Sequence, residues 1–187
     1  MSAIGADELV RRLDAAVSAG DVETVTRQVQ SEIENVLQPG RLRLDERFRR
    51  TLPDHYARRL LHRDPARRYT VLVLAWAPGQ GTPIHDHPNL WSVEGVLEGE
   101  LEVTQYAPIK EEAHRCKFAP VESHRVVAGE ANFLIPPFEY HALTNDLTDR
   151  PCLTIHAFGG ELMEMNTFDP VGNGWYERSL RRVSYDA

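Results

Sequence analysis

Two histidines separated by a single residue are the side chains best placed to do chemistry in this sequence. They end the stretch Gly79-Gln-Gly-Thr-Pro-Ile-His85-Asp-His87, which follows an uncharged run at 71–77 that we expect to be a buried strand. In an extended segment, residues at i and i+2 project from the same face, so the two imidazoles can converge. Imidazole is a common ligand of transition metals. The pair therefore predicts a metal site.

Two groups of residues set this pair in a larger pattern. The first group is Gly79, His85, His87 and Gly99, and the second is Gly129, Pro136, His141 and Asn145. Together they resemble the two signature motifs of the cupin superfamily. This resemblance implies a mostly β fold, the cupin barrel (a double-stranded β-helix or jelly roll), with its ligand site inside. It also implies that His141 is the third metal ligand.

The sequence departs from the general cupin signature at the carboxylate ligand. The signature has a glutamate four or five residues after the second histidine, where this chain has Trp91 and Ser92. Glu94 shares the strand parity of Ser92 and would substitute only if the strand were bulged. We expect Glu94 to point elsewhere and the ligands to be three neutral histidines. Such a site keeps the full charge of the metal, which favours an anionic substrate such as a thiolate.

A closer resemblance covers residues 45–170. The stretch from Trp76 to His87, the run from Tyr56 to Pro65, and Thr154-Ile-His156-Ala-Phe158 are similar to the bacterial thiol dioxygenases of the cysteine dioxygenase family, which includes the 3-mercaptopropionate enzymes. The resemblance implies that Fe(2+) is the cofactor. It also implies that both atoms of O2 are added to the thiol of a small carboxylate-bearing substrate, which gives a sulfinate.

The same resemblance assigns roles to residues other than the metal ligands. Arg58 matches the arginine that binds the substrate carboxylate in the cysteine enzymes, and a guanidinium fork suits that group. Arg59 is the alternative if the register is shifted by one residue. Thr154 and His156 match a Ser-x-His pair near the iron, and at i and i+2 they should meet on one strand face.

Phe158 stands where the family has a tyrosine, so the ring is kept but its hydroxyl is lost. Ser92 is near the position of the cysteine that cross-links to that tyrosine in animal enzymes, so no thioether can form. The substrate therefore stays open among cysteine, 3-mercaptopropionate and related mercapto acids, including a dicarboxylic thiol. Two alternatives are a cupin of other chemistry, such as a carbon-oxidising dioxygenase, and a non-catalytic metal-binding sensor. Three histidines also suit nickel, cobalt or zinc.

We expect one cupin domain over 1–187, with a helical region at 1–65 and a β-barrel at 66–187. Apolar residues recur with helical spacing over 6–37, interrupted at Gly20-Asp21 by a stop and a new N-cap. A third short helix is expected at 53–61. Short strands separated by turn residues follow. We place them at 69–76, 90–97, around 101–103, and at 115–119, 124–128, 132–135, 141–144 and 152–158, with only a weak signal near 183–185.

Composition limits the partners. The 187 residues carry a formal net charge of −7, which disfavours nucleic acid as the main partner. No apolar run approaches the ~20 residues of a membrane span, and the N-terminus lacks signal-peptide features. Two cysteines give no disulfide framework. We expect a cytoplasmic protein that binds a small-molecule thiol and O2, and that is a monomer or a homodimer formed through helices 6–37.

Overall fold

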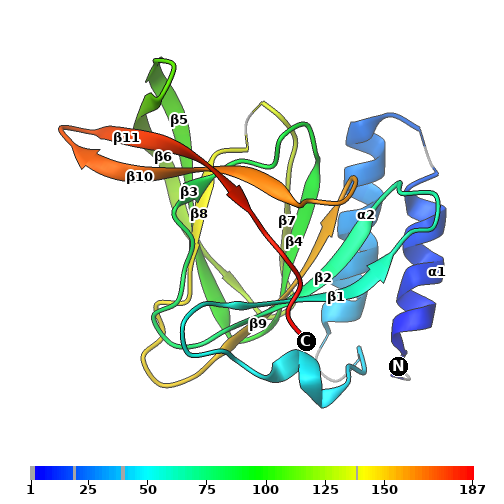
Figure 1. The fold of residues 1–187 in the computed structure, drawn as a ribbon. Coiled ribbons are helices and arrows are strands. Elements are labelled where there is room, and N and C mark those ends of the chain that lie inside the picture. Colours follow the sequence, from blue (N-terminus) through cyan, green and yellow to red (C-terminus); the bar gives the residue numbers. More distant parts are fainter. Residues whose placement is uncertain (1–2, 19, 39–40, 138) are drawn as a thin grey trace.

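The computed structural model describes residues 3–18, 20–38, 41–137 and 139–187. Helices come first in this part of the chain, and strands make up most of the rest (Figure 1). The helical elements are α1 (Ala6–Ala16), α2 (Val22–Leu37) and the short 3-10 helix η1 (Glu46–Arg49). The break expected at Gly20-Asp21 is confirmed, because the Asp21 side chain caps α2 by accepting a hydrogen bond from the Thr24 N–H at 2.9 Å.

The strands form two antiparallel sheets. The five-stranded sheet has the order β1 (Ala57–Arg63), β2 (Thr70–Trp76), β9 (Cys152–Phe158), β4 (Ser92–Glu98) and β7 (Ala131–Leu134). The second sheet has the order β10 (Glu164–Gly172), β11 (Trp175–Arg182), β6 (Arg115–Val127), β5 (Glu100–Glu111), β8 (His141–Thr144) and β3 (Ile84–His85). It closes on itself because β3 also pairs with β10. The expected mostly β barrel with N-terminal helices is confirmed.

Strand β2 shows how the layers are built, because its two faces are buried against different partners. Leu72 and Leu74 face inward and share a core with Leu143 of the second sheet. Val71 faces outward and packs with Ile33 of α2, so the helices cover the outer face of the five-stranded sheet (Figure 1). Successive side chains of a strand point to opposite faces, and both faces of β2 are buried. Every residue in the strand is therefore best apolar, which explains the uninterrupted apolar run.

One predicted element is wrong in type. The helix expected at 53–61 is replaced by β1, in which Arg58 pairs with Leu74 of β2. Leucine and arginine are good helix formers, but pairing with β2 decides the conformation. The division at residue 65 therefore falls between two paired strands. The sequence signal also missed β10 and β11, a long hairpin formed by largely polar residues, and no strand is assigned at 183–185.

Two other expectations concern cysteine and membranes. Cys116 and Cys152 are both free and buried. In the described part of the chain, every helix is too short or too polar to cross a bilayer.

Candidate metal centre

Three histidines converge at one point between the two sheets. His85 ends β3, His87 follows it by two residues, and His141 begins β8 opposite His85. Their potential ligand nitrogens all lie within 4.8 Å of one another. All three side chains are buried, with exposed fractions of 4% or less. The structure thus brings together the three residues predicted to hold the metal, and the donor set suits a transition metal ion.

The backbone fixes the orientation of two of these rings. His85 Nδ1 lies 3.2 Å from the Pro83 carbonyl oxygen, and His141 Nδ1 lies 2.5 Å from the Glu139 carbonyl oxygen. A carbonyl only accepts hydrogen bonds, so each Nδ1 carries the proton. In the neutral ring, Nε2 is then left with a free lone pair, which is the form that binds a metal.

The residue between the first two histidines anchors them. Asp86 points away from the histidines towards β10, where its carboxylate accepts hydrogen bonds from the Asn166 N–H at 2.9 Å and from Asn166 Nδ2 at 2.7 Å. Because side chains alternate along an extended segment, this contact holds His85 and His87 on the opposite, inward side.

The glycine-rich loop before the histidines packs tightly on β8. A Cβ atom on Gly81 would lie 2.6 Å from the Leu143 carbonyl oxygen, so a side chain does not fit there. Asn145 closes the other end of the contact, where its Nδ2 donates to the Trp76 carbonyl at 3.1 Å. The Asn145 contact explains the asparagine of the second motif, and the positive φ of Gly79 (78°) explains the glycine that begins the first.

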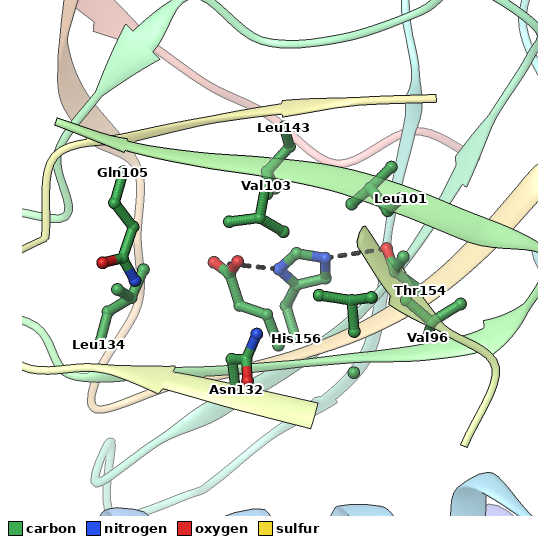
Figure 2. Close-up of a pocket in the computed structure, with 12 residues that line it drawn as sticks. Val96, Leu101, Val103, Gln105, Asn132, Leu134, Leu143, Thr154 and His156 are labelled. Carbon is green, nitrogen blue, oxygen red and sulfur yellow. Dashed lines mark hydrogen bonds and ion pairs between the residues drawn. The ribbon is translucent and has the colours of Figure 1, made fainter. Parts of the chain in front are cut away.

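Thr154 and His156 lie side by side on β9, as predicted from their spacing. His156 Nε2 is 2.8 Å from Thr154 Oγ1 (Figure 2). Trp76 Nε1 donates to the same hydroxyl at 2.9 Å. Because the indole only donates, the Thr154 proton is available for His156 Nε2. The neutral His156 ring then carries its proton on Nδ1. Sequence reasoning missed the part of Trp76 in this chain of hydrogen bonds.

The expectation that Glu94 points elsewhere is wrong. Glu94 pairs with His156 across β4 and β9, and its Oε1 lies 3.4 Å from His156 Nδ1, 3.5 Å from His141 Nε2 and 3.9 Å from His87 Nε2. No bulge is needed, because the β4–β9 register is regular from Ser92 to Val96. The only sequence signal for Glu94 was its spacing of two residues from Ser92, which puts both side chains on the same face of the strand. The site therefore contains a carboxylate beside the three histidines, and its Oε1 atom is buried.

Burial and neighbouring charges shift the acidities at this site. Burial lowers the pKa of His85 to about 3 and that of His87 well below its usual value, and His141 adds to both shifts. Burial raises the pKa of Glu94, but His141 and His156 more than offset this and hold it well below its usual range. Burial lowers the pKa of His141, whereas Glu94 raises it more. A metal must therefore displace protons from His141 more than from the other two.

The two candidate arginines lie on opposite faces of β1. Arg58 lines the cavity that His85, His87 and His156 also line. Its guanidinium donates to the Leu162 carbonyl at 2.5 Å and to the Ser184 carbonyl at 3.3 Å. Arg59 points the other way and donates to the Arg50 carbonyl at 2.6 Å. Burial lowers the pKa of Arg58, although a guanidinium stays charged at neutral pH.

Phe158 forms part of the wall beside the histidines. Its ring packs edge to face against His87, with centroids 5.0 Å apart, and lies 6.1 Å from the His156 ring. The rest of the wall is mainly apolar and includes Leu72 and Leu162. Such a lining excludes water and strengthens electrostatic interactions inside the cavity. Five of the residues predicted for the site thus line this cavity: Arg58, His85, His87, His156 and Phe158. His141 and Thr154 contact residues that line it, whereas Arg59 points away.

The sequence is similar to a known protein family and to two of its curated members. A family profile described as "Cysteine dioxygenase type I" matches residues 16–171. The chain belongs to this family. Human cysteine dioxygenase type 1 is 25% identical over 104 residues, which are 54% of this chain and 50% of the human protein, and the Pongo abelii protein matches to the same extent. This member of the family spans about half the length of the curated relatives it matches.

One solved structure supports the fold, and a second matches with a lower TM-score. A protein with a double-stranded β-helix domain from Klebsiella pneumoniae matches with a TM-score of 0.51 and 17% identity, over 65% of this chain and 86% of that one. The protein TT1209 from Thermus thermophilus matches with a TM-score of 0.49 and 23% identity, over 63% of this chain and 96% of that one. At these identities, the likeness concerns the fold alone.

Proposed function

We propose that this family member is a non-haem iron dioxygenase that oxidises a small carboxylate-bearing thiol to its sulfinate. Cysteine, 3-mercaptopropionate and related mercapto acids are the candidate substrates. One observation carries the proposal: two of the three clustered histidines, His85 and His87, line the same cavity as the buried guanidinium of Arg58. In that arrangement, a metal held by the histidines would bind the sulfur of a small molecule, and the guanidinium would bind the carboxylate of the same molecule. Membership of the cysteine dioxygenase family supports it.

The reaction balances without a reducing cosubstrate. The thiol sulfur loses four electrons and O2 gains them, both oxygen atoms form bonds to sulfur, and the S–H proton is released. A ferrous ion held by His85, His87 and His141 would supply the redox chemistry between sulfur and dioxygen. The chain itself binds and orients the thiol and keeps bulk water from the reacting atoms.

Arg58 would orient the substrate. A guanidinium has five N–H donors, and the bonds to the Leu162 and Ser184 carbonyls hold it in place while leaving donors for a carboxylate. Phe158 presents an apolar face where the family has a hydroxyl, so substrate positioning depends more on Arg58 here. His156, fixed by Thr154, keeps its Nδ1 proton on the side of Glu94.

The test is turnover with a panel of thiols. Protein purified without metal is loaded anaerobically with Fe(2+) and mixed with O2 and each thiol, including cysteine, 3-mercaptopropionate and mercaptosuccinate. We expect oxygen consumption and a product heavier by two oxygen atoms, both of which are labelled when 18O2 is used. Full iron loading with no sulfinate from any thiol in the panel would refute the proposal.

A second candidate function is oxidation at carbon. Two observations favour it: the carboxylate of Glu94 lies beside the histidines, and Phe158 lacks the hydroxyl typical of the family. Mass spectrometry of the products separates the two functions, since label on a carbon atom rather than on sulfur decides for the second.

A further inference from the structure

Glu94 and His141 present two bare acceptors to each other. His141 donates its Nδ1 proton to the Glu139 carbonyl, so the neutral ring turns the lone pair of Nε2 towards Glu94 Oε1, 3.5 Å away. Both atoms are buried, and neither has a hydrogen-bond partner among the described residues. Two facing acceptors in a buried site are unfavourable, because each has lost its water. A cation between them, either a second proton on His141 or a metal ion, removes this cost.

The position of Glu94 relative to the other histidines fits a metal ion as that cation. Oε1 lies within 4 Å of both His141 Nε2 and His87 Nε2, which belong to the cluster of ligand nitrogens. Carboxylate oxygen and imidazole nitrogen are compatible ligands for iron, zinc and cobalt. The carboxylate therefore lies at the edge of the place where three histidines would hold an ion.

The same carboxylate oxygen also faces a partner of fixed orientation. His156 Nδ1 lies 3.4 Å from Oε1, and its proton is set there by the chain Trp76–Thr154–His156. Ligating carboxylates are commonly oriented by such a neighbour. Trp76 and Thr154 thus support His156, and His156 supports Glu94.

We propose that Glu94 is a fourth protein ligand, so that this site holds its metal with three histidines and one carboxylate. The inference rests on the proposed function only for the presence of a metal, and not for the substrate. A carboxylate ligand lowers the net charge of a divalent centre from two to one. The centre then attracts a thiolate less strongly than three neutral histidines would, so the guanidinium of Arg58 matters more for binding an anionic substrate.

The first experiment measures metal affinity. Fe(2+) and Zn(2+) are titrated anaerobically into metal-free wild-type protein and into Glu94→Gln, in competition with a chromophoric chelator. Glutamine keeps the size of the side chain and removes its charge, so we expect an affinity at least 10-fold weaker. Glu98→Gln is the matched control, because Glu98 ends the same strand and pairs with Arg49 at the surface.

The second experiment uses wild-type protein and separates a ligand from a neighbour of the ligands. In a crystal structure of the zinc-loaded protein we expect a Glu94 oxygen about 2.0–2.2 Å from the ion. A distance above about 3 Å, or unchanged affinity in Glu94→Gln, overturns the inference while leaving the proposed function intact. A wild-type protein that takes up no metal overturns both.

Discussion

At the scale of single residues, the opposite directions of two adjacent arginines make the substrate proposal testable. Arg58→Met removes the cation that faces the cavity and should raise the KM for the best carboxylated thiol about 10- to 100-fold, because a hydrogen bond to a charged group is worth about 1.5–3 kcal/mol. Arg59→Met removes a contact with the Arg50 carbonyl on the other face and should leave KM unchanged. The measurement is oxygen consumption against thiol concentration.

The comparison of Arg58→Met with Arg59→Met needs a folding control and a second substitution of Arg58. Arg58 also binds the Leu162 and Ser184 carbonyls, so iron content and circular dichroism must show that Arg58→Met is folded. Arg58→Lys keeps the charge without the two-pronged geometry and should give an intermediate KM. Equal effects of Arg58→Met and Arg59→Met would contradict the assignment.

The residue scale also shows how far the site could be predicted. His85 and His87 follow from the period-two alternation of an extended chain, which needs no knowledge of the fold. For Thr154 and His156, alternation predicts only that they share a strand face, and the resemblance to a family placed them near the metal. His141 required the resemblance to a family, because it comes from a distant strand. Glu94 was assigned away from the site because a general motif places the carboxylate elsewhere, although its parity with Ser92 pointed inward. The hydrogen bond from Trp76 to Thr154 depends on the pairing of β2 with β9, which the local sequence does not predict.

At the scale of elements, local sequence predicted strands best where the apolar pattern was strong. β2 and β9 are buried on both faces and were predicted nearly to their ends. β1 was taken for a helix because its arginines and leucines favour one, and only pairing with β2 makes it a strand. The β10–β11 hairpin is exposed along much of its length, so its residues carry little apolar alternation.

The packing of α2 on β4 depends on a residue without a side chain. A Cβ atom on Gly95 would lie 2.8 Å from Leu37 Cδ1 and 2.9 Å from Ile33 Cγ2. Gly95→Val should therefore destabilise the protein by about 1–3 kcal/mol through overpacking, and Gly95→Ala by less. Urea unfolding followed by circular dichroism measures both.

A double variant tests the mechanism behind this loss. Leu37→Ala alone leaves a cavity and should cost about 2–5 kcal/mol. In Gly95→Val, the same change makes room for the new side chain, so the double variant should lose less stability than the sum of the single losses. Additive losses would show that the valine does not press on Leu37.

At the scale of the whole molecule, the barrel class could be predicted, but the number of strands and the pairing of the sheets could not. Which strands face each other is decided by contacts between residues far apart in the chain, such as Leu72 with Leu143. That pairing brings Glu94 and His156 of the five-stranded sheet to His85 and His141 of the closed sheet. The organisation as one domain, the monomer or homodimer state and the cytoplasmic location stay predictions.

Because the proposed ligands come from both sheets, metal binding should stabilise the whole barrel. Binding to the folded state alone, at a free metal concentration 100 times Kd, adds about 2.7 kcal/mol. For a chain of this size, each 1 kcal/mol raises Tm by about 2–4 °C, so loading should raise Tm by about 5–11 °C. Thermal melts of metal-free and zinc-loaded protein measure this shift.

Variants of the two sheets then show which ligands cross-link them. His141→Ala removes a ligand of the closed sheet and should abolish the rise in Tm. Glu94→Gln removes the link to the five-stranded sheet and should reduce the rise at the same metal concentration, because weaker binding contributes less free energy. An equal rise in wild type and His141→Ala would mean that the metal stabilises the protein at some other place. An equal rise in wild type and Glu94→Gln would mean that the histidines alone hold it.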